Sequence, residues 1–140
     1  MKIVYKYPPN IEKIRAVFPL HKGIIFTYGD TLYNPDRGKI DEALMKHEET
    51  HTRQQGDDID GWWEKYFVDV DFRMKQELEA YQNQYKYAVE NYSRNMRRVL
   101  LKVISKDLSS AMYGNIISEE EAKGAIKEMQ EQKKLDTGII

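Results

Sequence analysis

The chain of 140 residues contains no cysteine, which excludes disulfide bonds and thiolate metal sites. Its formal net charge is −1, so no excess of one sign indicates a nucleic-acid or membrane surface. No apolar run reaches the roughly 18 residues of a membrane-spanning helix, and the N-terminus lacks a signal-peptide core. With 41% hydrophobic and 32% charged residues, the composition predicts a single soluble domain over residues 1–140 that resides in the cytoplasm.

Histidine is also scarce, yet two of the three histidines stand four residues apart in His47-Glu48-Glu49-Thr50-His51, an H-E-x-x-H motif. Side chains at this spacing lie on one face of a helix, one turn apart. Two such imidazoles can bind one Zn²⁺ at roughly 2.0–2.1 Å and leave room for a third protein ligand and a water. Glu48 can then take a proton from that water, whose pKa the metal lowers to about 7. The motif therefore predicts a zinc hydrolase, and in particular a peptidase.

The residues around the motif predict a helix over 41–56, with Asp41 as N-cap and Gly56 at its end. At helical spacing, His47, Glu48 and His51 continue an apolar face that begins at Ile40. Glu49 falls on the opposite, charged face. The pattern thus predicts that both histidines are buried and that Glu49 faces water.

The rest of the chain predicts an α+β domain. Residues 1–37 are β-rich, with a hairpin formed by residues 23–28 and 31–33 and a short helix over 11–17 between it and the first strand. Residues 61–63, Gly61-Trp62-Trp63, are expected in a loop, with the tryptophans packing in the core. A helical period then extends over 72–106, with a break near residues 91–93, and a last helix covers 118–133.

Two residues, Asp57 and Glu77, are candidates for the third zinc ligand. Asp57 has the spacing of H-E-x-x-H-x-x-G-x-x-[HD] sites, but Gln54 stands where those sites need the conformational freedom of glycine. Glu77 lies on the 72–106 helix at the edge of its apolar stripe, whereas Glu79 has polar neighbours. A glutamate from a second helix would complete a His₂Glu site. This comparison favours Glu77 as the ligand and Glu79 as a surface residue.

Together with H-E-x-x-H, the segment Glu77-Leu78-Glu79-Ala80 resembles the second-helix element of the gluzincin class of zincin metallopeptidases. The resemblance covers roughly residues 23–90. It implies that His47, His51 and Glu77 bind zinc, that Glu48 is the general base, and that a peptide or protein substrate pairs with the hairpin. The chain also resembles small zincin-like proteins of phages and prophages, which would place it in the virion if a phage encodes it.

The sequence departs from the gluzincin pattern at Tyr81, where many members carry an aspartate that orients a ligating histidine. The residue that stabilises the oxyanion also stays open among five candidates, namely His21, Tyr28, Tyr81, Tyr85 and Tyr113. A metallopeptidase is the first functional hypothesis, and a non-enzymatic zincin-like structural or assembly protein, such as a phage particle component, is the alternative. The basic residues between Arg94 and Lys106 are interpreted as a solvated helix face, so no nucleic-acid partner is expected.

Overall fold

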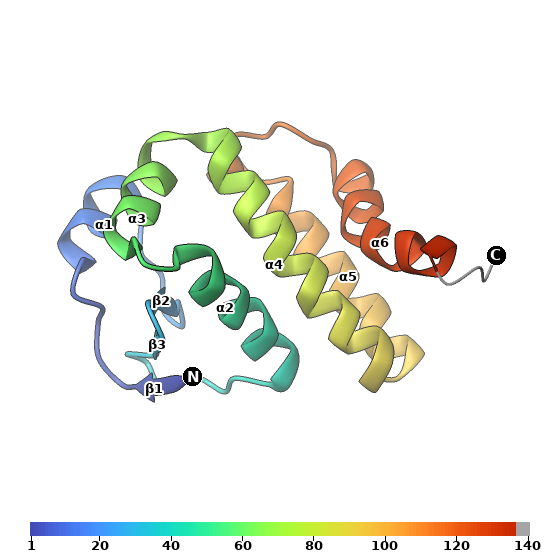
Figure 1. Ribbon diagram of the computed structural model, residues 1–140, viewed down its shortest axis with the longest axis horizontal. Coiled ribbons are helices and arrows are strands. Elements are labelled where there is room, and N and C mark those ends of the chain that lie inside the picture. Colours follow the sequence, from blue (N-terminus) through green and yellow to red (C-terminus); the bar gives the residue numbers. More distant parts are fainter. Residues whose placement is uncertain (137–140) are drawn as a thin grey trace.

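A computed structural model describes the backbone of residues 1–136 and the side chains of residues 1–128. The described part is a small, mostly helical α+β fold (Figure 1). Its elements in chain order are β1 (Lys2–Val4), α1 (Ile11–Val17), β2 (Phe26–Tyr28), β3 (Thr31–Tyr33), α2 (Glu42–Gln55), α3 (Ile59–Val68), α4 (Val70–Asn91), α5 (Arg94–Leu108), the 3₁₀ turn η1 (Ala111–Tyr113) and α6 (Glu119–Asp136).

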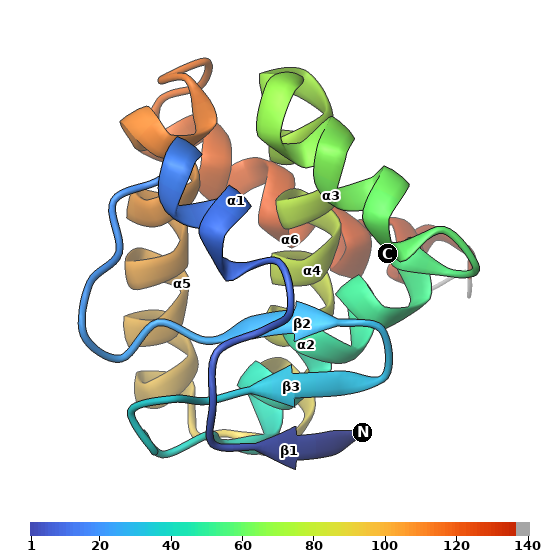
Figure 2. The ribbon, with the colours of Figure 1, turned by 90° about the vertical axis from the view of Figure 1, so that its left-hand side faces the viewer.

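The three strands form one sheet in the order β1-β3-β2. The expected hairpin is present, because β2 and β3 pair antiparallel across the turn at Gly29 and Asp30. β1 pairs with β3 in parallel and is shorter than the alternation of the sequence suggests. β3 is therefore the central strand, and β2 is an edge strand that lies against α2 (Figure 2).

The helix that carries the H-E-x-x-H motif is α2, and its ends follow from local chemistry. The side chain of Asp41 accepts a hydrogen bond from the backbone N–H of Leu44 at 2.9 Å, which caps the first turn. Gly56 ends the helix with a φ of +51°, a conformation that favours glycine. His47, Glu48 and His51 are buried and Glu49 is exposed, as the facing pattern predicts.

The prediction of a loop through residues 61–63 is wrong, because these residues lie in α3. Asp58 caps this helix by accepting from the backbone N–H of Gly61 at 3.0 Å. A Cβ atom on Gly61 would lie 2.1 Å from a carboxylate oxygen of Asp58, so the tight cap needs glycine at this position. Gly61, which in the sequence indicates a loop, thus belongs to the first turn of α3. Trp62 and Trp63 are buried, as expected.

The helical pattern over residues 72–106 corresponds to two helices. α4 ends at Asn91, and Ser93 caps α5 by accepting from the backbone N–H of Met96 at 3.2 Å. The break falls where the sequence suggests it, and α5 returns alongside α4 (Figure 1). None of the helices in the described residues is long and apolar enough to cross a membrane.

The buried side chains form two apolar clusters. One lies among α4, α5 and α6 and includes Leu101, Ile104, Leu108 and Ile126. The other joins α1, the sheet and α3, and its aromatic members include Trp62 and Trp63. α2 packs extensively on α4 between the two clusters. The polar residues of the H-E-x-x-H motif therefore sit where the two halves of the core meet.

We expect the replacement of Leu108 by alanine to lower the free energy of unfolding by roughly 2–5 kcal/mol, because it leaves a cavity in a packed cluster. Leu108 is only 1% exposed. Urea unfolding followed by circular dichroism measures the change. Val68→Ala is the matched control: Val68 is 84% exposed, so its loss should change stability by less than about 0.5 kcal/mol. Equal effects of the two substitutions would contradict the packing of α5 described above.

Candidate metal centre

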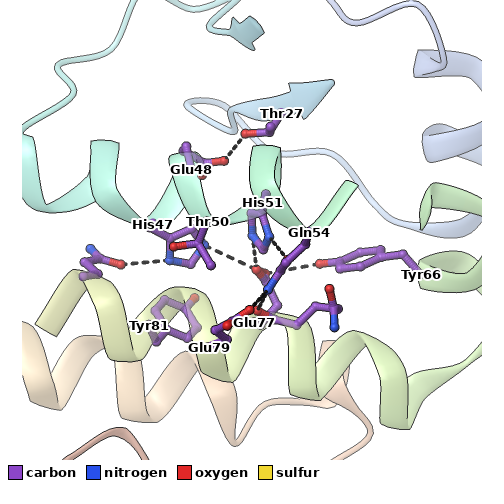
Figure 3. Close-up of polar contacts among 12 residues, drawn as sticks. Thr27, His47, Glu48, Thr50, His51, Gln54, Tyr66, Glu77, Glu79 and Tyr81 are labelled. Carbon is purple, nitrogen blue, oxygen red and sulfur yellow. Dashed lines mark hydrogen bonds and ion pairs between the residues drawn. The ribbon is translucent and has the colours of Figure 1, made fainter. Parts of the chain in front are cut away.

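Three side chains from two helices converge at the α2–α4 contact. His47 and His51 extend from α2 and Glu77 extends from α4, and all three are buried (Figure 3). The Oε1 atom of Glu77 lies 3.3 Å from Nε2 of His47 and 2.5 Å from Nε2 of His51. One ligand atom of each residue lies within 4.8 Å of the others, close enough to bind a single metal ion. The structure thus brings the three predicted ligands together.

The other nitrogen of each imidazole contacts a glutamine. Nδ1 of His47 lies 3.0 Å from Oε1 of Gln84, and Nδ1 of His51 lies 2.8 Å from Oε1 of Gln54. An amide oxygen can only accept a hydrogen bond, so each Nδ1 must carry the proton and donate it. When the imidazole is neutral, Nε2 is therefore the nitrogen whose lone pair is available to a metal on the side of Glu77. Metal-binding histidines in proteins are usually oriented in this way.

The orientation of the Gln54 amide is itself fixed by its neighbours. Its Nε2 donates to the backbone carbonyl of Gln76 at 3.0 Å and to Oε1 of Glu79 at 2.8 Å. Both donors are therefore used on α4, and the amide oxygen must face His51. Glu79, predicted as a surface residue, is half-buried and supports the site through Gln54. Gln54 stands where other zinc motifs have a glycine, and its side chain instead orients His51.

The second oxygen of Glu77 is held by two tyrosines. Oε2 accepts from the hydroxyl of Tyr113 at 3.0 Å and from the hydroxyl of Tyr66 at 3.3 Å. Arg73, one turn before Glu77 on α4, donates to the backbone carbonyls of Tyr66 at 2.8 Å and Met112 at 2.7 Å. Arg73 therefore holds α3 and η1, the two segments that carry these tyrosines, against α4. The carboxylate offers only Oε1 to the histidine side.

The donor atoms around Glu77 Oε1 are of the kind that binds a metal ion. This buried oxygen has no hydrogen bond of acceptable direction, although both Nε2 atoms lie close to it. The three atoms are close enough to one another to bind one metal ion. Two imidazole nitrogens and one carboxylate oxygen also form a ligand set found in catalytic zinc sites. The residues present therefore fit a divalent metal ion.

Burial and neighbouring charge have opposite effects on the pKa of Glu77, and likewise on the pKa of His51. Burial raises the pKa of Glu77, but the charge of His51 and the close approach of both imidazoles outweigh it and hold this pKa well below its usual range. Burial lowers the pKa of His51, yet the negative charge and close approach of Glu77 raise it to about 9. Burial and the charge of Glu77 also raise the pKa of Tyr66 and Tyr113 well above 10. Glu77 therefore stays ionised and both tyrosines stay protonated at neutral pH.

Glu48, the predicted general base, lies beside the triad on the sheet-facing side of α2 (Figure 3). Its Oε2 accepts from the hydroxyl of Thr27 on β2 at 2.5 Å. Glu48 is buried, and its charge contributes to the raised pKa of His51. The hydrogen bond to Thr27 fixes one carboxylate oxygen and leaves Oε1 available.

A cavity of about 1310 Å³ opens onto these residues. His47, Glu48, His51 and Glu77 line its inner end, the segment from Val17 to Thr27 forms one wall, and α5 with η1 forms the other. Of the five candidates for oxyanion stabilisation, the lining includes only His21, Tyr81 and Tyr113. The hydroxyl of Tyr81 donates to Asp107 and that of Tyr113 to Glu77, so both are already hydrogen-bonded to carboxylates. The competing ligand Asp57 is exposed after the end of α2 and outside the triad.

Two residues of the site, Tyr66 and Gln84, were not anticipated from the sequence, and Tyr113 was considered only for the oxyanion and not as a partner of Glu77. Gln84 could have been found, because it lies seven residues after Glu77 and thus on the same face of α4. Tyr66 and Tyr113 come from other elements, and no local pattern indicates where they point. Comparisons of the chain with family models, curated proteins and solved structures found no match.

We expect Gln54→Ala to weaken metal binding roughly 10- to 100-fold, because His51 loses the acceptor that fixes its tautomer. A competition titration with a chromogenic zinc chelator measures the affinity. Gln82→Ala is the matched control, since Gln82 lies on the same helix as Glu77 but donates to the carbonyl of Ala125 on α6. An affinity that Gln54→Ala leaves unchanged would exclude the orienting role of Gln54.

We also expect metal affinity to rise with pH. In the metal-free protein His51 has a pKa of about 9, so below that pH it must lose a proton before Nε2 can bind a metal. Affinity should therefore fall by up to about tenfold for each pH unit below 9 and level off above it. Glu77 is ionised throughout this range and adds no further proton. Zinc titration in weakly buffered solution with a pH indicator should detect the released proton; no release at pH 7 would contradict this assignment.

Proposed function

We propose that this protein is a zinc-dependent peptidase. The observation that supports it best is the placement of Glu48: a buried carboxylate beside a His₂Glu triad, at the inner end of a large cavity. A purely structural zinc site is usually closed by four protein ligands, whereas a catalytic site has three and an open position. Three candidate ligands lie within reach of one another in the described residues. A set of three protein ligands is typical of a catalytic zinc site.

The proposed reaction is hydrolysis of a peptide bond. A zinc ion bound by His47, His51 and Glu77 would supply an electrophile for the scissile carbonyl and lower the pKa of a water molecule. Glu48 accepts the proton of the attacking water and passes it to the nitrogen of the leaving amine. Because Thr27 holds Oε2, the proton is carried on Oε1. The two glutamines keep both imidazoles in the metal-binding tautomer during turnover.

The substrate would lie along the segment just before β2 rather than along the whole hairpin. β3 is paired on both sides and cannot accept another strand. At Thr27 of β2, the backbone carbonyl already accepts from Nε2 of Gln55 at 2.9 Å and from Nε1 of Trp63 at 3.2 Å. Gly23, Ile24 and Ile25 line the cavity and precede these occupied groups. The N–H of Gly23 already donates to Oδ2 of Asp36 at 2.7 Å and that of Ile24 to the carbonyl of His21 at 3.4 Å, so an extended peptide would pair with the carbonyls of this segment.

We expect Glu48→Gln to retain the fold and about one equivalent of zinc but to lower kcat by roughly 10²- to 10⁴-fold, since glutamine cannot accept the proton. The measurement combines metal analysis of the purified protein with cleavage of a broad peptide library, read by mass spectrometry. Glu49→Gln is the matched control: it makes the same chemical change on the adjacent residue, which is exposed and pairs with Lys46 at 3.7 Å.

Two results would overturn the proposal in different ways. Native protein that binds no zinc would remove the metal site and the peptidase together. Native protein that binds one equivalent of zinc but cleaves nothing in the library would favour the non-enzymatic alternative, in which the metal stabilises a structural or assembly protein.

A further inference from the structure

The outer side of α5 exposes apolar side chains next to the cavity. Met96, Val99 and Val103 are 56%, 56% and 60% exposed, and Leu100 and Val103 line the cavity wall. At helical spacing Met96, Val99, Leu100 and Val103 form one continuous strip, which we call the outer strip. The outer strip extends the apolar wall of the cavity along α5 towards Arg94.

A row of positive charge runs beside the outer strip. Arg98, Lys102 and Lys106 are exposed and follow one another at four-residue spacing, and we call them the basic row. No ion pair among the side chains that the structure describes involves any of these three. The helix as a whole carries five basic residues and one acidic residue, in a chain of net charge −1. Positive charge is thus concentrated on this wall.

The cavity joins this wall to the candidate catalytic residues. Lys106 lines the cavity together with Val103, and Lys39 lines it from the loop after β3. The acidic residues of the inner end, Glu48 and Glu77, are buried and hydrogen-bonded to Thr27 and to tyrosines. A ligand that reaches from the triad to α5 therefore leaves an enclosed centre and meets apolar and basic side chains. It also meets one carboxylate, Asp107, which already accepts from the hydroxyl of Tyr81.

We infer that α5 selects the substrate: the cleft takes a polypeptide segment that sets an apolar side chain against the outer strip and an acidic side chain against the basic row. This inference rests on the proposed peptidase function and names the substrate class. Apolar contact supplies affinity, and the complementary charge supplies selection between peptides.

The composition of the wall favours a polypeptide over other polyanions. Single-stranded nucleic acids stack their bases on aromatic rings, and the outer strip holds only aliphatic side chains and methionine. Helices that bind membrane surfaces insert large groups such as Trp, Phe and Leu from one long face. Here the exposed apolar residues are mostly valines beside a concave cavity.

The test uses zinc-loaded protein with Glu48→Gln, which should hold peptides without cleaving them. Three fluorescein-labelled eight-residue peptides serve as probes, with alternating Glu and Leu, alternating Lys and Leu, or alternating Glu and Ser. Fluorescence anisotropy should show that the Glu–Leu peptide binds at least about fivefold more tightly than either other peptide. Its advantage over the Lys–Leu peptide should shrink at about 0.5 M salt, which screens exposed charges.

Substitutions on α5 separate the two contributions. Lys102→Glu combined with Lys106→Glu should reverse the order of the Glu–Leu and Lys–Leu peptides. Val99→Ser combined with Val103→Ser should remove the preference for Glu–Leu over Glu–Ser. The matched control is Lys123→Glu with Lys127→Glu on α6, which has the same spacing and charge change and should keep the original order. Circular dichroism checks that each variant is folded.

Equal binding of the three peptides, or an order that the α5 charge reversal leaves unchanged, would overturn the inference. So would tight binding of a single-stranded DNA 12-mer or of phosphatidylglycerol vesicles that the charge reversal abolishes, because the wall would then serve that partner. These results are distinct from failure of the proposed function. Peptide cleavage without the expected preference overturns the inference alone, whereas the expected preference without cleavage by native protein overturns only the peptidase.

Discussion

The structure depends on one buried negative charge, the carboxylate of Glu77. A carboxylate that is 6% exposed must be compensated, because an unpaired charge away from water is costly. Two imidazoles from α2 approach one of its oxygens and two tyrosine hydroxyls bind the other. These partners come from α2, α3 and η1, so satisfying one side chain of α4 fixes how these elements pack on it. The contact between α2 and α4 is accordingly the most extensive in the described fold.

The sequence predicts the part of the site that a helix determines locally. The four-residue spacing of His47 and His51 places both rings on one face, and the flanking Asp41 and Gly56 define where that helix begins and ends. Glu77 could be chosen over Glu79 because apolar neighbours mark the buried side of α4. Each of these predictions concerns which face of a helix is buried. Such information is encoded in the period of the sequence and does not require knowledge of the tertiary fold.

The contacts that sequence reasoning missed depend on the tertiary fold rather than on the helical period of the sequence. Tyr66 and Tyr113 reach Glu77 only because Arg73 binds the carbonyls of the segments that carry them, and a contact between distant segments leaves no local pattern. α3 escaped prediction because Gly61, an indicator of turns, is needed by the capping carboxylate of Asp58. Gln54 was interpreted through the glycine it replaces, whereas its amide orients His51.

The two ends of the cavity differ in how tightly their side chains are held. At the inner end, each polar atom of the histidines and of Glu77 other than the three convergent ones has a hydrogen-bond partner, so only the metal-facing positions stay free for a ligand. Side chains fixed in this way lose little freedom when a metal or substrate binds. At the outer end, Met96, Val99, Val103 and the basic row of α5 are exposed, so they can change without disturbing the core. Under the proposed function, substitutions on α5 would therefore alter which polypeptide is bound, while the residues proposed for the chemistry lie on α2 and α4.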